Sequence, residues 1–129
     1  MATARDVVTA SLRELGIIDG VEEAAAEDAA HALAIFNQML AAWELDGIAL
    51  GLGTVTLNTT LALPDSHIEA LRANLAARLA APFARQPSPL TVEQASRGYR
   101  SLQGAYARRR LLSVDPGIRW RRPTFGRFR

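Results

Sequence analysis

The stretch that most constrains the fold of this chain runs from Glu27 to Leu45. It contains neither Gly nor Pro and is rich in Ala and Leu, a composition that favours an α-helix. Its apolar side chains recur at alternating spacings of four and three, the pattern of one apolar stripe along a helix. The stripe consists of Ala29, Leu33, Phe36, Leu40 and Trp43. At 1.5 Å per residue this helix would be about 28 Å long, the width of a small domain, so we expect the other helices to pack on it.

A shorter helix is expected on the N-terminal side of this stretch. Thr3 can cap it with its side-chain oxygen, and Asp6 stands three residues later, where a capping box has its acid. The helix should end at Gly16, and the central helix at Gly47. Glycine readily adopts the left-handed conformation that follows many helix C-termini.

Two further helices are expected in the second half of the chain. One begins at Pro64, with Asp65 or Ser66 as its cap. The other begins either with Ser88 as its cap and Pro in the first turn, or with Thr91 as its cap. The side chains expected on their inner faces are Ile68, Leu71, Leu75 and Leu79 in the third helix and Val92, Ala95, Tyr99, Leu102 and Tyr106 in the last.

Residues 48–63 have a different pattern. Gly51 and Gly53 interrupt any helix, and the apolar side chains that follow alternate with Thr and Asn, which is typical of extended β structure. The alternating residues are Val55, Leu57, Leu61 and Leu63. We expect a short β-hairpin or an extended excursion here, and the register stays open.

These patterns predict a mainly α-helical fold, a small bundle of about four helices formed by residues 1–112. The chain of 129 residues is long enough for one domain with its own core. We expect the core to be anchored by Leu33, Phe36, Leu40, Trp43, Leu71, Leu75 and Tyr99. There is no cysteine, which excludes disulfides and thiolate chemistry. The N-terminal residues do not have the pattern of a signal peptide, and no apolar run is long enough to span a membrane, so we expect no membrane association.

Charge is strongly segregated along the chain. Residues 1–84 contain four Arg and eleven Asp or Glu, a net charge of −7, whereas residues 85–129 contain eleven Arg against Glu93 and Asp115, a net charge of +9. A GC-rich genome explains why every basic residue is Arg, but it does not explain the segregation. The pattern indicates a C-terminal end that contacts acidic groups on protein or nucleic acid.

The last residues, 113–129, lack helical or strand periodicity and form what we call the C-terminal arm. Arginine and large apolar side chains alternate in it, at Ile118, Arg119, Trp120, Arg121, Arg122, Phe125, Arg127, Phe128 and Arg129. Disordered segments are poor in aromatic residues, whereas Arg and Trp dominate binding hot spots. A solvated end is the alternative, but the composition favours an arm that binds a partner. Composition alone leaves protein and nucleic acid open as that partner.

No pattern of catalytic residues is present. His31 and His67 lie on different expected helices, and the acidic residues between 22 and 28 suit the positive end of a helix dipole. The chain has no nucleophile elbow, no phosphate-binding glycine loop and no HExxH motif. We therefore expect neither an enzyme nor a metal or cofactor site.

Several segments resemble the head-to-tail connector proteins of tailed bacteriophages, also described as adaptor, tail accessory or packaged-DNA stabilisation proteins. The most informative match is Phe36-Asn37-Gln38-Met39-Leu40 with Trp43, where that family tends to have Leu-Asn-x-Met-Leu-x-x-Trp. The second match is Leu63-Pro64 followed by Glu69-Ala70-Leu71, Asn74-Leu75-Ala76 and Arg78-Leu79-Ala80. The resemblance covers residues 1–112, and these are packing motifs. The chain departs from the family in having Ala24–Ala26 where the second helix often has a Ser or Thr cap, and in a short extended region.

The resemblance implies a helical adaptor whose copies form a homo-oligomeric ring, expected to contain twelve subunits to match the portal. Such a ring docks beneath the portal protein after packaging, extends the DNA channel without sequence-specific binding, and receives tail or stopper proteins. The expected location is the neck of the virion, assembled in the host cytoplasm. In that family the arm reaches along the portal, which would assign this role to residues 113–129. The alternative, from another class of function, is a small nucleic-acid-binding regulatory protein that uses the Arg/aromatic arm.

Overall fold

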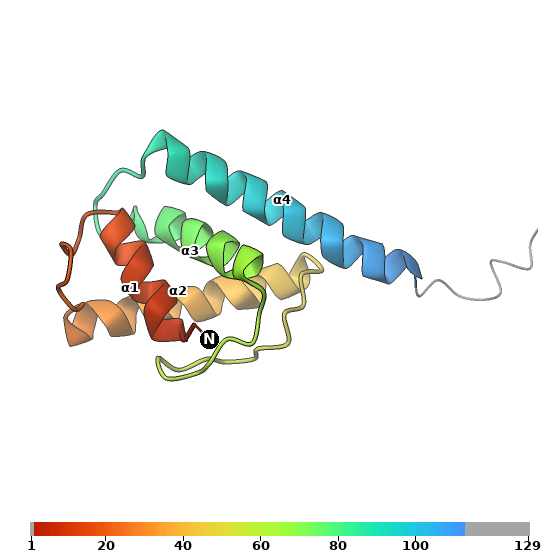
Figure 1. Ribbon diagram of the computed structural model, residues 1–129, viewed down its shortest axis with the longest axis horizontal. Coiled ribbons are helices and arrows are strands. Elements are labelled where there is room, and N and C mark those ends of the chain that lie inside the picture. The colour runs from red at the N-terminus through yellow and green to blue at the C-terminus, as the bar shows by residue number, and fades with distance from the viewer. Residues whose placement is uncertain (1, 113–129) are drawn as a thin grey trace, which may run out of the picture.

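The computed structural model describes residues 2–112, and side chains as far as residue 107. This part of the chain is mainly helical, as the sequence predicts, and contains the four expected helices (Figure 1). They are α1 (Ala4–Glu14), α2 (Ala26–Leu45), α3 (Asp65–Leu79) and α4 (Pro89–Leu112). The predicted C-terminal arm, residues 113–129, lies outside the described residues.

The predicted ends of α1 and α2 are confirmed. Thr3 and Asp6 form a reciprocal capping box, in which each side chain accepts a hydrogen bond from the backbone N–H of the other residue, at 3.3 and 2.9 Å. Gly16 and Gly47 follow the two helices with φ of 73° and 92°. Behind Gly47, the N–H of Ile48 donates to the carbonyl of the third-last residue of α2, which is the Schellman arrangement.

The starts of α3 and α4 separate the alternatives that the sequence left open. Pro64 occupies the N-cap of α3 and makes no side-chain capping bond, so the prediction that Asp65 or Ser66 caps this helix is wrong. Asp65 is instead the first helical residue, where its charge suits the helix dipole. At α4, the Oγ of Ser88 accepts a hydrogen bond from the N–H of Thr91 at 3.1 Å, which confirms Ser88 with Pro at the first position.

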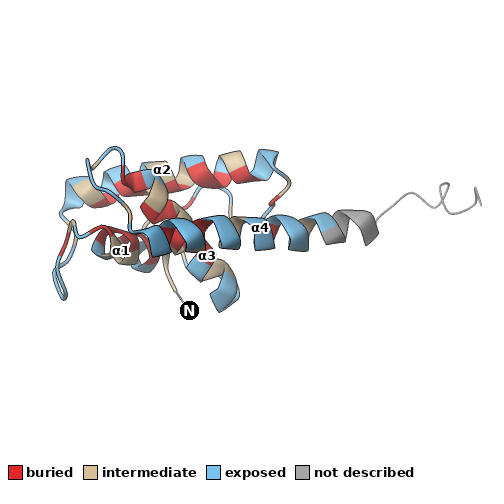
Figure 2. Ribbon diagram, turned by 90° about the horizontal axis from the view of Figure 1, so that it is seen from above, coloured by how far each residue is buried: buried red, intermediate tan, exposed pale blue. Residues whose placement is uncertain are grey.

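The core lies between α2 on one side and α1 with α3 on the other. Figure 2 shows the buried residues on the facing sides of these helices. Of the expected anchors, Phe36, Leu40, Trp43, Leu71 and Leu75 are buried, whereas Leu33 and Tyr99 are half-buried. The most completely buried large side chains are Trp43 and Phe36, so the apolar stripe of α2 faces the interior.

The expectation that every helix packs on α2 is only partly met by α4, which packs chiefly on α3 and contacts α2 through the side chain of Tyr99. Figures 1 and 2 show the backbones of α2 and α4 apart, and α3 is the helix whose backbone lies close to the other three. The reason lies in the small residues of α3. Ala70, Ala73 and Ala76 are buried, and because they lie on more than one side of the helix, several neighbours can approach its backbone closely.

Helices α3 and α4 form an antiparallel hairpin with a close contact near its middle. A Cβ built on Gly98 would lie 2.8 Å from the Cβ of Ala70, so the two backbones meet where both side chains are minimal. The buried face of α4 contains Thr91, Ala95 and Leu102. Val92, predicted on the inner face, is 47% exposed, because the helix turns Thr91 inward in its place.

The predicted β-hairpin is not formed within residues 48–63, which instead make an irregular excursion. Its hydrogen-bonding partner is the N-terminal segment: Thr60 forms an isolated antiparallel bridge with Thr3, and the N–H of Leu61 donates to the carbonyl of Ala2 at 2.9 Å. Gly51 and Gly53 have positive φ, so the backbone before Val55 cannot pair as a strand. We refer to residues 46–64 as the α2–α3 loop.

Candidate interaction site

The residues predicted to bind a partner, from Ile118 to Arg129, all lie outside the described part of the chain. The surfaces that a partner could contact are described below, beginning with the α2–α3 loop.

Asn37 fixes this loop to the outer side of α2. Its side-chain oxygen accepts a hydrogen bond from the N–H of Val55 at 2.9 Å, and its side-chain nitrogen donates to the carbonyl of Val55 at 3.1 Å. The backbone polar groups of Val55, a residue that is 1% exposed, are thus both satisfied by one side chain. The loop is held as if it were paired with a strand, although its partner is an amide on a helix.

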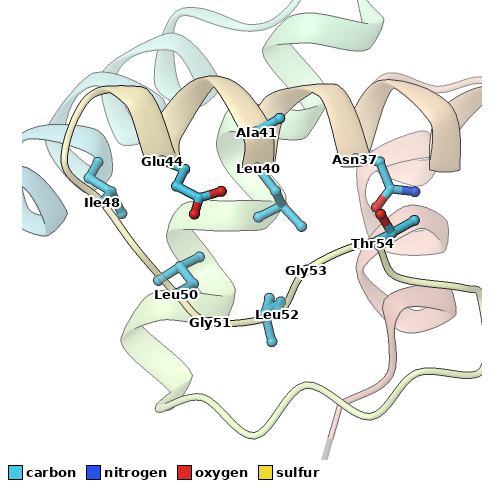
Figure 3. A pocket seen from close by; sticks show the side chains of 10 residues that line it. All are labelled: Asn37, Leu40, Ala41, Glu44, Ile48, Leu50, Gly51, Leu52, Gly53 and Thr54. Atoms are coloured by element: carbon cyan, nitrogen blue, oxygen red, sulfur yellow. The ribbon is translucent and has the colours of Figure 1, made fainter.

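A pocket of about 230 Å³ lies between α2 and the loop segment that precedes Val55. Figure 3 shows the side chains of Leu40 and Glu44 directed from α2 toward the loop, with Leu50 and Leu52 opposite them. Ile48 closes one end and is buried, whereas Leu50 and Leu52 are half-buried and line the open side. We call this hollow the α2–loop pocket. Its lining residues are Asn37, Leu40, Ala41, Glu44, Ile48, Leu50, Gly51, Leu52, Gly53 and Thr54.

The α2–loop pocket has an acidic rim. Glu44 is its one charged lining residue, and within the described residues this carboxylate has no ion pair or hydrogen bond. Leu45, the next residue, is 90% exposed beside it. The pocket therefore combines an apolar floor with a single carboxylate, an arrangement suited to a side chain or peptide that is apolar and positively charged.

Two other hollows in the described part of the chain carry charges of both signs. A groove of about 390 Å³ between α3 and α4 includes Glu69 and Arg97, and each of these side chains is already in an ion pair on its own helix. A hollow of about 310 Å³ beside α1 has charged residues of both signs in its lining, namely Arg5, Asp6, Arg13 and Glu23. Neither hollow favours one sign of charge in a ligand.

A polar contact joins α4 to the end of α2, close to the pocket. The hydroxyl of Tyr99 donates to the carboxylate of Asp46, and its ring packs against Trp43 with the ring centroids 5.7 Å apart. The hydrogen bond to Asp46 raises the pKa of the Tyr99 hydroxyl above its ordinary value of 10.0, as do its partial burial and the negative charge of Asp46. The positive charge of Arg78 opposes this rise.

A second polar junction holds the beginning of α4. The carboxylate of Glu14, on α1, forms an ion pair with Arg72 of α3 and accepts a hydrogen bond from the hydroxyl of Thr91 at 2.8 Å. Three helices thus meet at one carboxylate. These two polar contacts add to the packing of α4 on α3.

The two histidines that the sequence analysis set aside lie on the surface of the bundle. His31 is exposed, with its ring 5.6 Å from that of Phe83, and His67 is half-buried, 6.1 Å from the ring of Tyr106. Within residues 2–112 no three His, Asp or Glu side chains converge in a way that could hold a metal ion.

The sequence analysis missed the α2–loop pocket. Its loop residues were predicted to form a hairpin or an extended excursion, and Glu44 was not singled out. One local signal was available, since Leu50 and Leu52 alternate with glycines that could not themselves bury surface. The position of these leucines against α2 depends on the Asn37 contact, which no local pattern reveals.

No protein-family model matches the chain, and no curated protein matches it significantly. No helix within residues 2–112 is both long enough and apolar enough to cross a membrane.

Proposed function

We propose that this chain is a structural head-to-tail adaptor of a tailed bacteriophage. Copies of it form a ring, expected to have twelve subunits, beneath the portal protein in the neck of the virion. The ring extends the DNA channel after packaging and receives tail or stopper proteins on its other side. Assembly takes place in the host cytoplasm. The proposal begins from the resemblance of residues 1–112 to that family.

The conformation of the motif residues is consistent with a structural role. Phe36, Met39, Leu40 and Trp43 are all buried, so the residues that carry the resemblance build the core. Asn37, between them, holds the α2–α3 loop. Close packing of the motif residues supports a structural role for the motif.

The observation that carries the proposal is the position of α4. It packs on the body as far as Leu102 and Tyr106, and its C-terminal end projects beyond the other helices (Figure 1). The described chain therefore ends at the tip of a helix, about 9 Å beyond Tyr106, since Leu112 is six residues later. The arginine-rich residues that follow begin from this tip, as expected of a subunit that reaches into a neighbouring protein.

The test is binding to the portal protein of the same phage, measured with purified components and viewed by electron microscopy. The full chain should form rings on the portal, and a chain lacking residues 113–129 should not. A full-length variant with Trp120→Ala, Phe125→Ala and Phe128→Ala keeps every arginine, and it should also lose most of the affinity if the arm binds through apolar burial. Circular dichroism establishes that each variant keeps its helical body. Equal binding by the truncated and full chains would refute the proposal.

Nucleic-acid binding is the second candidate, favoured by the net charge of +9 in residues 85–129. A protein of that kind should retard duplex DNA in a gel, with an affinity that falls steeply as salt rises, because each neutralised phosphate releases counterions. The proposed adaptor should show no such retardation at physiological salt. Retardation at that salt together with no binding to the portal would favour the second candidate over the first.

A further inference from the structure

The three hollows of the described residues differ in the charge of their lining, and only the α2–loop pocket has charge of a single sign. Glu44 is the single charged residue of the α2–loop pocket, whereas the other two hollows are lined by charges of both signs. The apolar side chains in its lining include Leu40, Ile48, Leu50 and Leu52. A ligand that matches it must present an apolar group flanked by a positive charge.

We propose that the α2–loop pocket receives the C-terminal arm of a second copy of this chain, with Trp120 as the side chain that enters it. The inference deepens the proposed ring by naming a contact between neighbouring subunits, and it rests on that proposal only for the arrangement of the subunits. The contact itself requires no portal protein.

The arm has the chemistry that the pocket requires. Trp120 is flanked by Arg119 and Arg121, so whichever direction the arm runs, a guanidinium lies next to the indole. Glu44, which has no partner within the described residues, can accept the paired N–H groups of that guanidinium. An indole inserted beside a carboxylate–guanidinium pair is the usual composition of a binding hot spot.

The geometry of α4 favours a second copy over the pocket of the same chain. Tyr99 of α4 contacts Asp46 at the end of α2, two residues after Glu44 of the pocket, and α4 then continues for about 20 Å to Leu112. To fill its own pocket, the arm would have to reverse direction after α4 and cover that distance within the eight residues from Leu112 to Trp120, whose full extension is about 26–29 Å. A neighbouring subunit placed beyond the tip of α4 requires no reversal. The contact is heterologous, pocket to arm, and contacts of this kind generate rings.

The test is a binding titration of the full chain with a fluorescent peptide of residues 113–129, followed by anisotropy at protein concentrations where the full chain is monomeric. The peptide should bind, and replacing its three aromatic residues by Ala should weaken binding more than tenfold although all arginines remain. In the protein, Leu52→Arg and Glu44→Gln should each weaken binding of the unmodified peptide more than tenfold. The control variants are Leu90→Arg, at an exposed leucine of α4, and Glu27→Gln, at another exposed acid, and they should leave binding unchanged. A peptide with a photoreactive benzoylphenylalanine in place of Trp120 should cross-link to residues 37–54.

The competing occupants give different results in the same titration. If the arm filled its own pocket, a full chain with Trp120→Ala, Phe125→Ala and Phe128→Ala would bind the peptide more than tenfold more tightly than the native chain, and that result would overturn the proposal. Equal binding by both chains is expected. No binding, or cross-links outside the pocket, would also overturn it. Ring formation on the portal is measured separately, for the native chain and for Leu52→Arg. If the peptide fails to bind the pocket while the native chain still forms rings on the portal, this inference fails and the proposed function stands.

Discussion

At the scale of single residues, Asn37 connects α2 to the α2–α3 loop through two hydrogen bonds. It satisfies the buried N–H and carbonyl of Val55 and so positions the loop that lines the α2–loop pocket. Asn37→Ala should lower the free energy of unfolding by about 1–3 kcal/mol, the cost of leaving buried polar groups unpaired. Urea unfolding measures this loss. The control is Gln38→Ala at the next, exposed position, which should change stability by less than about 0.5 kcal/mol. Similar stabilities for the two variants would show that the hydrogen bonds between Asn37 and Val55 do not stabilise the fold.

Tyr99 should make the stability of the protein fall at alkaline pH. Its folded-state pKa is raised above 10.0, chiefly by the hydrogen bond to Asp46, so the folded protein favours the neutral hydroxyl. The stabilisation is therefore fully present below pH 10 and is lost as the pH rises through the folded-state pKa. Urea unfolding of the native chain and of Tyr99→Phe from pH 8 upward should show a gap in favour of the native chain that closes above pH 10. A gap that stays constant into the alkaline range would show that the hydroxyl does not bind Asp46.

The sequence was informative about residues whose role is local and uninformative about those whose partners are distant. Thr3, Ser88 and Gly47 act within a few residues of themselves, and their functions as caps were predictable. Asn37 and Glu14 act through contacts with residues 18 and 77 positions away. Nothing in their sequence neighbourhoods indicates such partners. The pocket rim at Glu44 belongs to the second group, because the loop that completes it is placed by one of these contacts.

At the scale of helices, the hairpin of α3 and α4 depends on the contact between Gly98 and Ala70. Gly98→Ala should destabilise the protein by about 1–2 kcal/mol, because a Cβ at this point overlaps Ala70 and the overlap outweighs the gain in helix propensity. Gly104→Ala, on the same helix, meets no atom within 4 Å and should stabilise by up to about 1 kcal/mol. Thermal unfolding compares the two variants. Stabilisation by both would show that α3 and α4 lie farther apart than described.

The prediction that α2 is the centre of the fold is only partly confirmed, because α2 and α3 contribute to the core in different ways. Its apolar stripe is strong because Phe36 and Trp43 are large, and α2 does supply the largest buried side chains. The helix that contacts all others is α3, whose buried alanines have little hydrophobic signal in the sequence but allow close approach from several directions. Periodicity measures how much apolar surface one face carries. It does not measure how many neighbours a narrow helix can accommodate.

At the scale of the whole molecule, the net charge of +2 conceals a strong dipole between a body of −7 and a C-terminal portion of +9. Subunits of this kind attract one another head to tail, because the positive end of one copy meets the acidic body of the next. Within the described residues, α4 belongs to the positive portion and packs on α3 of the acidic body.

Self-association of the full chain should therefore weaken as salt rises. Between about 0.1 M and about 1 M the Debye length falls from about 10 Å to about 3 Å, which removes most of the attraction between exposed charges. Sedimentation velocity over this range should show association weakening more than tenfold, while urea unfolding at the same salt concentrations should show that the helical body stays folded. Association that is unchanged or stronger at high salt would mean that subunits meet through apolar surface alone. In that case the segregation of arginine from the acids would have no part in assembly, and the choice of the acidic α2–loop pocket as the receiving site would lose its basis.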